Sequence, residues 1–199
     1  QKTEAWTWEH QALLHSRAVA GAPALRAAFE SVRREVLCRH VKRATLRDEV
    51  RSMRERMRRE LSRAGAGEFD LKQDPGGVAD IEFLAQYWVL EWAERYPPLV
   101  AFSDTIRQLE SVGSAALVDH AVVDDLVQAY RGYRRITHRL SLEQAGSVVP
   151  AGPHAGTRAR VTEIWEAVML SGELQLPPGL DAPGALPPHR RRRLYCPQT

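Results

Sequence analysis

Apolar residues recur every three or four positions along most of the chain, which is the spacing of one face of an α-helix. No run of alternating apolar and polar residues predicts a β-strand. The spacing predicts helices over about residues 5–16, 23–36, 45–61, 78–95, 104–109, 121–140 and 157–170. The sequence therefore predicts an all-α fold in which a bundle of helices buries the core.

Local signals refine several of these helices. Pro23 suits the first turn of the second helix, whereas Thr45 and Ser103 are candidate N-caps for the third and for a later short helix. The second helix carries one apolar stripe, formed by Leu25, Phe29, Val32 and Val36. The helix that begins near Val78 is apolar on most faces, which predicts that it is the buried centre of the bundle.

The third predicted helix is rich in arginine, and its charges have two interpretations. The arginines stand at positions 47, 51, 54, 56, 58 and 59. One interpretation is a binding surface for phosphate or for an acidic partner. The other is a solvated face, because glutamates interleave with the arginines and Arg51, Glu55 and Arg59 follow one another at intervals of four. We favour the solvated face.

The composition is that of a soluble globular protein, with 44% hydrophobic and 27% charged residues in 199. No stretch approaches the roughly 20 apolar residues of a membrane span, and the first residues lack the apolar region of a signal peptide. The two cysteines, Cys38 and Cys196, are too few for a disulfide framework. We therefore expect a cytoplasmic protein with no membrane partner, and we expect Gln1 to lie inside a longer reading frame.

The net charge of +3 depends on one run, Arg190–Arg193. Without that run, 24 basic residues face 25 acidic ones, so the folded part is close to neutral. This balance argues against a nucleic-acid-binding surface. Residues 173–199 combine the arginine run with clustered prolines, and we interpret them as a disordered Pro/Arg-rich tail.

The residue patterns that most kinds of catalysis require are absent from this sequence. No two of the seven histidines are four apart, and no cysteine or carboxylate cluster completes a metal site. No Gly-x-Ser-x-Gly elbow marks a nucleophile. Two-metal nucleotidyl transfer needs closely placed carboxylates, yet no two of the nine aspartates are two apart. We therefore expect no catalytic residue and no metal ligand in this chain.

One segment, Phe69–Phe83, has a chemically distinctive pattern. A turn at Gly76 and Gly77 leads into a helix N-terminus, where free N–H groups and the helix dipole favour an anion, and Lys72 adds a positive charge nearby. Asp80 and Glu82 are two apart on the helix and cannot hold one ion together. The five residues are candidates for proximity to a phosphate or nucleotide, and a purely structural helix junction is the alternative.

Several spaced segments resemble glutamine synthetase adenylyltransferase, in the same order. They are Trp6–Leu13, Arg33–Leu37, Val50–Arg58, Phe69–Lys72 with Gly76-Gly77, Asp80–Phe83 and Ser103–Glu110. The resemblance runs from about Ala5 to Leu170. It implies a bifunctional enzyme in which each of two nucleotidyltransferase domains precedes a helical bundle. One half transfers AMP from ATP, with Mg²⁺, to a tyrosine of glutamine synthetase; the other removes it, and the PII signal-transduction protein takes part in the control.

The resemblance also implies a place for this chain. Asp80–Phe83 is closest in form to the C-terminal, adenylylating half, and the family's catalytic aspartates belong before Gln1. Residues 1–20 would be the trailing edge of the nucleotidyltransferase domain, and 21–172 the helical bundle. ATP and Mg²⁺ would be bound in the full-length enzyme, and we expect this chain alone to be inactive. The alternatives are a regulatory bundle that binds PII without contacting nucleotide and, more distantly, a nucleic-acid-binding helical domain.

Overall fold

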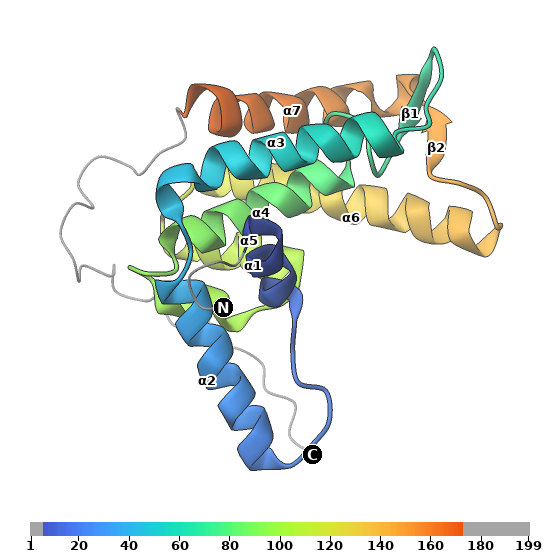
Figure 1. Cartoon of the computed structure of the whole chain (residues 1–199). Coiled ribbons are helices and arrows are strands. Elements are labelled where there is room, and N and C mark those ends of the chain that lie inside the picture. Colours follow the sequence, from blue (N-terminus) through green and yellow to red (C-terminus); the bar gives the residue numbers. More distant parts are fainter. Residues whose placement is uncertain (1–5, 173–199) are drawn as a thin grey trace.

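Helices make up most of residues 6–172, the part of the chain that this computed structural model describes (Figure 1). The all-α prediction is confirmed. The predicted tail, 173–199, lies outside the described residues. In chain order the elements are α1 (Thr7–His15), α2 (Pro23–Arg39), α3 (Arg43–Leu61), β1 (Glu68–Asp70), α4 (Val78–Trp92), a 3-10 helix (Pro97–Ala101), α5 (Thr105–Ser114), α6 (His120–Leu142), β2 (Val148–Pro150), a 3-10 turn (Gly152–His154), α7 (Ala155–Glu166) and a π-helical turn (Ala167–Ser171).

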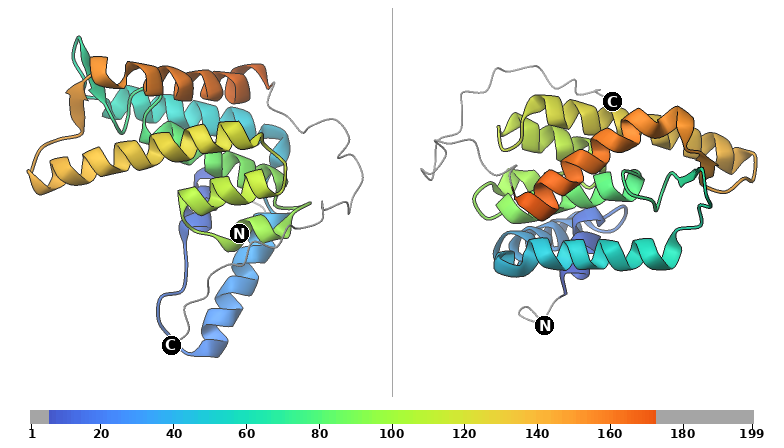
Figure 2. Two further views of the ribbon diagram at one scale, coloured as in Figure 1. Left: turned by 180° about the vertical axis from the view of Figure 1, so that it is seen from behind. Right: turned by 90° about the horizontal axis from the view of Figure 1, so that it is seen from above.

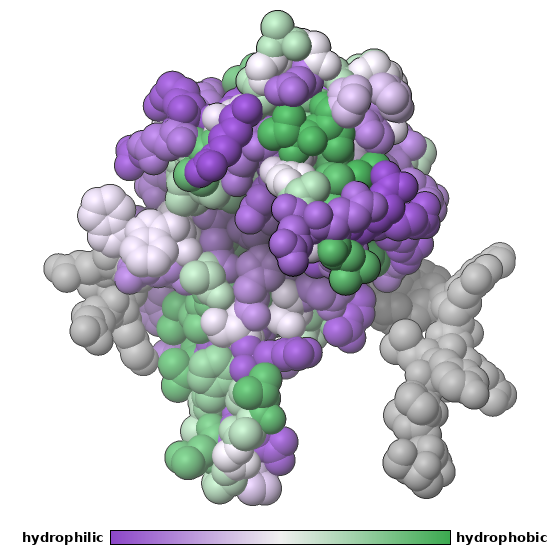
Figure 3. Space-filling view, turned by 90° about the vertical axis from the view of Figure 1, so that its right-hand side faces the viewer, coloured by the Kyte–Doolittle hydropathy of each residue, from purple (hydrophilic) through white to green (hydrophobic). Residues whose placement is uncertain are grey.

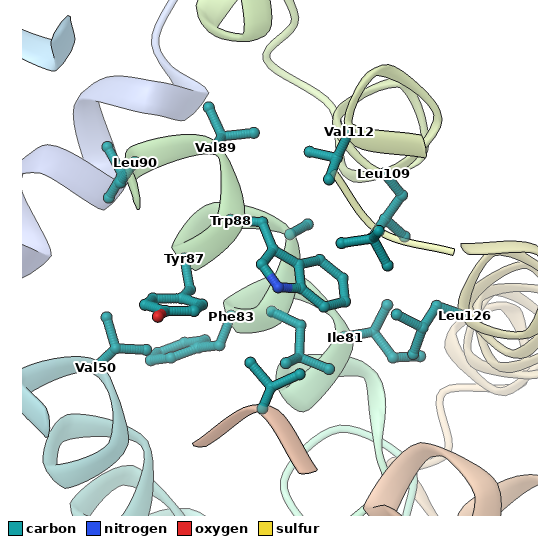
Figure 4. Close-up of a cluster of buried hydrophobic side chains, with 14 of the residues drawn as sticks. Val50, Ile81, Phe83, Tyr87, Trp88, Val89, Leu90, Leu109, Val112 and Leu126 are labelled. Carbon is teal, nitrogen blue, oxygen red and sulfur yellow. The ribbon is translucent and has the colours of Figure 1, made fainter. Parts of the chain in front are cut away.

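Helix α4 lies at the centre of the bundle, as its apolar sequence predicts. It contacts α1, α3, α5, α6 and α7, and Figures 1 and 2 show it enclosed by them. Trp88 in its middle is fully buried and points toward Leu109 and Leu126 of the neighbouring helices (Figure 4). Burying a helix on all sides removes a large apolar area from water, so α4 anchors the core.

A short two-stranded antiparallel sheet interrupts the helical pattern. Strands β1 and β2 pair with Phe69 opposite Val149. The extended segment at Phe69 was predicted, but β2 was missed because three residues are too few to show the alternation of a strand. This small sheet closes one end of the bundle and positions the turn that leads into α4 (Figure 1).

Two predicted helix caps differ in the structure. Helix α3 begins at Arg43 rather than near Thr45, whose hydroxyl donates a hydrogen bond to Glu49 (2.5 Å). The N-cap of α5 is Asp104 rather than Ser103, and its carboxylate accepts from the backbone N–H of Arg107 (3.1 Å). A carboxylate is also favoured over a hydroxyl by the positive end of the helix dipole.

Helix α2 begins at Pro23 as predicted, but its apolar stripe does not lie in the core. Leu25 is 70% exposed and Val32 is 55% exposed. Contacts to the rest of the molecule come from α1 and from the 3-10 helix, and the first half of α2 projects away from the bundle (Figures 1 and 2). Among the described helices, none is long and apolar enough to cross a membrane.

Candidate functional site

A buried ion pair joins α3 to the first turn of α4. The guanidinium of Arg54 donates from Nε to Oδ1 of Asp80 at 2.7 Å, and the two side chains are 0% and 1% exposed. Arg58, one turn further along α3, donates from Nη2 to both oxygens of Asp80 at 3.2 Å. The interpretation of α3 as a solvated arginine face is therefore wrong at Arg54 and Arg58, which turn toward the bundle.

Burial decides the electrostatics of this pair. Desolvation lowers the pKa of the Arg54 guanidinium, and the neighbouring Asp80 carboxylate opposes that shift. The same guanidinium donates from Nη2 to the backbone carbonyl of Gln73 at 2.8 Å. Because a buried charge without its partner is strongly destabilising, Arg54 and Asp80 hold α3, α4 and the preceding turn as one unit.

The turn before α4 is built on two glycines that nothing larger could replace. Gly76 has a φ of +79°, and a Cβ added there would lie 2.3 Å from the carbonyl oxygen of Arg158. A Cβ on Gly77 would lie 2.7 Å from the carbonyl oxygen of Leu71. The N–H of Gly76 donates to Oδ2 of Asp80 at 2.7 Å. The turn thus packs tightly against α7 on one side and is tied to α4 on the other.

The chain itself supplies acceptors for the donors at this helix N-terminus. Gly77 N–H donates to Asp74 O (3.0 Å), Val78 N–H to Leu71 O (2.8 Å) and Ala79 N–H to Lys72 O (3.2 Å). Asp80 supplies the negative charge that the helix dipole favours. The side chain of Lys72 is exposed beside this closed turn. Contact with a phosphate at this corner stays a prediction, and Lys72 is the predicted site residue that a ligand could reach directly.

Two further aspartates brace the turn. Asp70 is 2% exposed and accepts through Oδ1 from Lys72 N–H (2.9 Å), Gln73 N–H (3.2 Å) and the hydroxyl of Ser147 (2.8 Å). Asp74 accepts from the hydroxyl of Ser62 at 2.6 Å and from Asp70 N–H at 3.0 Å. These roles were not predicted from the sequence, although an aspartate just before a turn is a common acceptor for the next backbone N–H groups.

Glu82 faces a different side of α4 from Asp80, as their spacing predicts. Its Oε1 accepts from the hydroxyl of Tyr130 on α6 at 3.0 Å. Burial raises the pKa of the Tyr130 hydroxyl, and the Glu82 carboxylate adds to that rise. The two carboxylates therefore bind opposite neighbours, α3 and α6, and do not form one site.

Arg158 of α7 covers the turn from the third side. Its Nε donates to the carbonyl of Pro75 at 3.0 Å, and its guanidinium carbon lies 4.7 Å from the centroid of the Phe69 ring. Cation–π contact of this kind favours arginine over lysine. This role could not be predicted from the sequence, because nothing near Arg158 marks it as a partner of a turn about 80 residues earlier.

The residues present do not fit a magnesium site. Between residues 6 and 172, no group of three His, Cys, Asp or Glu side chains is placed to hold a metal ion. The aspartates of the turn already accept hydrogen bonds from arginines, hydroxyls and backbone N–H groups. What the arrangement can do is fix the geometry of the turn and present the Lys72 ammonium at the surface.

Comparison with known proteins identifies similar chains. Residues 45–146 match the family model described as GlnD PII-uridylyltransferase. Three similar proteins are each named as a bifunctional glutamine synthetase adenylyltransferase/adenylyl-removing enzyme. The one from Nitrosococcus oceani is 46% identical over 169 residues, which are 85% of this chain and 17% of that protein. Those from Hahella chejuensis and Pseudomonas aeruginosa are each 44% identical, over 84% and 85% of this chain and 18% of each relative. The chain thus spans less than a fifth of the length of these relatives.

Proposed function

We propose that this chain, which belongs to the glutamine synthetase adenylyltransferase family, is a helical part of such an enzyme and supports AMP transfer to glutamine synthetase. Residues 45–146 of the chain also match the GlnD PII-uridylyltransferase model. The reaction would take AMP from ATP, with Mg²⁺, to a tyrosine of the substrate protein. The other half of the enzyme would reverse it. The PII protein would be a regulatory partner.

One observation carries this proposal. Three of the segments that carry the family resemblance meet at the buried site described above: Val50–Arg58, Phe69–Lys72 with Gly76-Gly77, and Asp80–Phe83. Their contacts join α3, the turn and α4, so the resemblance corresponds to one three-dimensional unit rather than to scattered similarities. Such a unit can hold a surface residue in a fixed place relative to a neighbouring domain.

Within this unit we assign the direct role to Lys72. Its backbone is fixed on both sides, because its N–H donates to Asp70 and its carbonyl accepts from Ala79. An exposed ammonium on a rigid backbone is suited to contact a phosphate or the AMP group across a domain boundary. Asp80 and the two glycines would act by positioning it, and Glu82 by fixing α4 to α6. ATP and Mg²⁺ would be bound by parts of the enzyme outside this chain.

Kinetics of the full-length enzyme test this assignment. We expect Lys72→Ala to lower the rate of AMP transfer about tenfold, which corresponds to about 1.4 kcal/mol of transition-state stabilisation. The melting temperature should stay unchanged, because the side chain is exposed. Lys42→Ala is the matched control, since Lys42 is also an exposed lysine but lies at the N-cap of α3, and it should leave the rate unchanged.

Equal rates for Lys72→Ala and Lys42→Ala would leave the turn as a structural junction only. A loss of PII response with an unchanged rate of AMP transfer would instead favour the alternative, a regulatory bundle that binds PII without contacting nucleotide.

A further inference from the structure

Helix α1 docks on the bundle largely through polar side chains. It lies beside the base of α2, whose projecting half carries exposed hydrophobic side chains (Figure 3). The buried residues of α1 are Leu14 at 0%, His10 at 3% and Gln11 at 5% exposure. Only one of the three is apolar, so hydrophobic burial contributes less to the docking of α1 than to the packing of the core helices. The docking therefore depends on how well the polar groups of α1 are accommodated.

Two of these polar side chains have buried atoms without a partner. Between residues 6 and 172, no hydrogen-bond partner meets Nε2 of His10, and none meets Nε2 or Oε1 of Gln11. Such an atom costs free energy when it is unpaired away from water, and a charged donor costs more than a neutral one. A protonated imidazole carries an N–H on both ring nitrogens. Protonation of His10 would therefore place a charge and an unpaired donor in the interface.

The surroundings of His10 favour its neutral form. Burial lowers the pKa of the ring below its ordinary value of about 6.5. Hydrogen bonding to the Trp6 backbone opposes this shift, as do the carboxylates of Glu9 on α1 and Glu49 on α3. His40, at the C-cap of α2, adds to it. The docked ring therefore binds a proton less readily than a histidine in water.

Neighbouring polar groups are already engaged with other residues. Oε2 of Glu49 accepts from the hydroxyl of Thr7, and its Oε1 accepts from the hydroxyl of Thr45. From α4, the uncharged amide of Gln86 is hydrogen-bonded to Nε2 of His15 at 2.8 Å. A charged His10 ring is therefore better accommodated by water than by this interface.

We propose that α1 is a pH-sensitive element of the fold, which protonation of His10 releases from α3 and α4. The released ring binds a proton more readily than the docked one, so docking is complete above about pH 6.5 and weakens as the pH falls below it. A nine-residue helix is too short to persist in water by itself, so α1 unfolds when it leaves the bundle. Helix α4 stays folded, because apolar burial holds it in the core.

Amide hydrogen exchange in the full-length enzyme, at about pH 7.5 and about pH 5.5, tests this release. After correction for the intrinsic effect of pH on exchange, we expect the protection of residues 11–15 to fall about threefold or more at the lower pH. The protection of α4 should not change. His10→Gln places a neutral amide at this position and should remove the pH dependence. His138→Gln is the control, because His138 is an exposed histidine of α6, and it should behave as the wild type.

The ring itself gives a second measurement in the wild-type enzyme. Deuterium exchange at the carbon between the two ring nitrogens measures the pKa of an individual histidine. We expect His10 to titrate below about pH 6.5. This measurement decides the question even where His10→Gln prevents α1 from docking.

Three results would overturn the proposal. Equal corrected protection of α1 at both pH values in the wild type would show that the helix stays docked. The same loss of protection in His10→Gln would assign the pH dependence to another group. Glu49 is already separated from His10, because hydrogen bonds from Thr45 and Thr7 lower the pKa of its carboxyl below 4.5 and keep it ionised at about pH 5.5. A His10 ring that titrates at or above about pH 6.5 would show that the docked helix tolerates the charge.

Discussion

The guanidinium of Arg54 and the carboxylate of Asp80 form an ion pair that is withdrawn from solvent, with Nε 2.7 Å from Oδ1. Each side chain also bonds the turn between the two helices, Arg54 through Gln73 O and Asp80 through Gly76 N–H. The pair is therefore the point at which α3, α4 and the turn are joined.

Removing one member of this pair should destabilise the chain. We expect Arg54→Met or Asp80→Asn to lower the free energy of unfolding by about 3–5 kcal/mol. Asp80→Asn leaves the buried Arg54 charge without its partner, and Arg54→Met leaves the buried Asp80 carboxylate with only the partly exposed Arg58. Urea denaturation of the chain measures the change. Arg56→Met is the control, since Arg56 is exposed on the same helix, and it should cost less than about 0.5 kcal/mol. A similar small loss for Arg54→Met would contradict the proposed central role of the pair.

How much of this site the sequence predicts depends on the kind of signal. The continuous apolar pattern of α4 predicts its central position, and the paired glycines predict the turn, because both signals are local. The burial of Arg54 could not be predicted: arginines three or four apart among glutamates look the same whether they face solvent or a buried carboxylate. The partnership with Asp80 depends on how α3 packs against α4, which no spacing within either helix encodes.

The apolar stripe of α2 shows the opposite difference, because it is more exposed than its sequence pattern indicates. The positions of Leu25, Phe29, Val32 and Val36 correctly indicate an amphipathic helix, but periodicity cannot say which molecule covers the apolar face. Leu25 and Val32 lie largely in solvent and Phe29 and Val36 are half-buried, so the pattern predicts the helix but not how far its apolar side is covered.

The turn glycine Gly76 should not tolerate a side chain. Gly76→Ala would place a Cβ 2.3 Å from Arg158 O and 2.7 Å from the hydroxyl oxygen of Thr162, at a positive φ. We expect a loss of more than about 1 kcal/mol in the free energy of unfolding. The matched control is Gly156→Ala in α7, where open space surrounds the added methyl group. It should be neutral or should stabilise the helix by about 0.5–1 kcal/mol. Equal effects at the two glycines would contradict the tight packing of the turn against α7.

Alkaline pH should weaken the fold through Tyr133. Burial raises the pKa of its hydroxyl to about 12, whereas an unfolded tyrosine ionises near pH 10. The neutral side chain therefore contributes its full stabilisation below about pH 10, and this is lost as the pH rises toward 12. Urea midpoints between pH 9 and 12 should fall, and they should fall less steeply in Tyr133→Phe. The same slope in both proteins would show that Tyr133 ionises as readily when folded as when unfolded.

The transfer of AMP to glutamine synthetase tests the central claim most directly. The full-length enzyme that contains this chain and the 199-residue chain alone would each be incubated with labelled ATP, Mg²⁺ and glutamine synthetase. We predict Mg²⁺-dependent labelling of glutamine synthetase by the full-length enzyme and none above background by the chain, because residues 6–172 hold no metal-binding carboxylate cluster. Labelling by the chain alone would place the active centre within it, and no labelling by the full-length protein would contradict the proposed function.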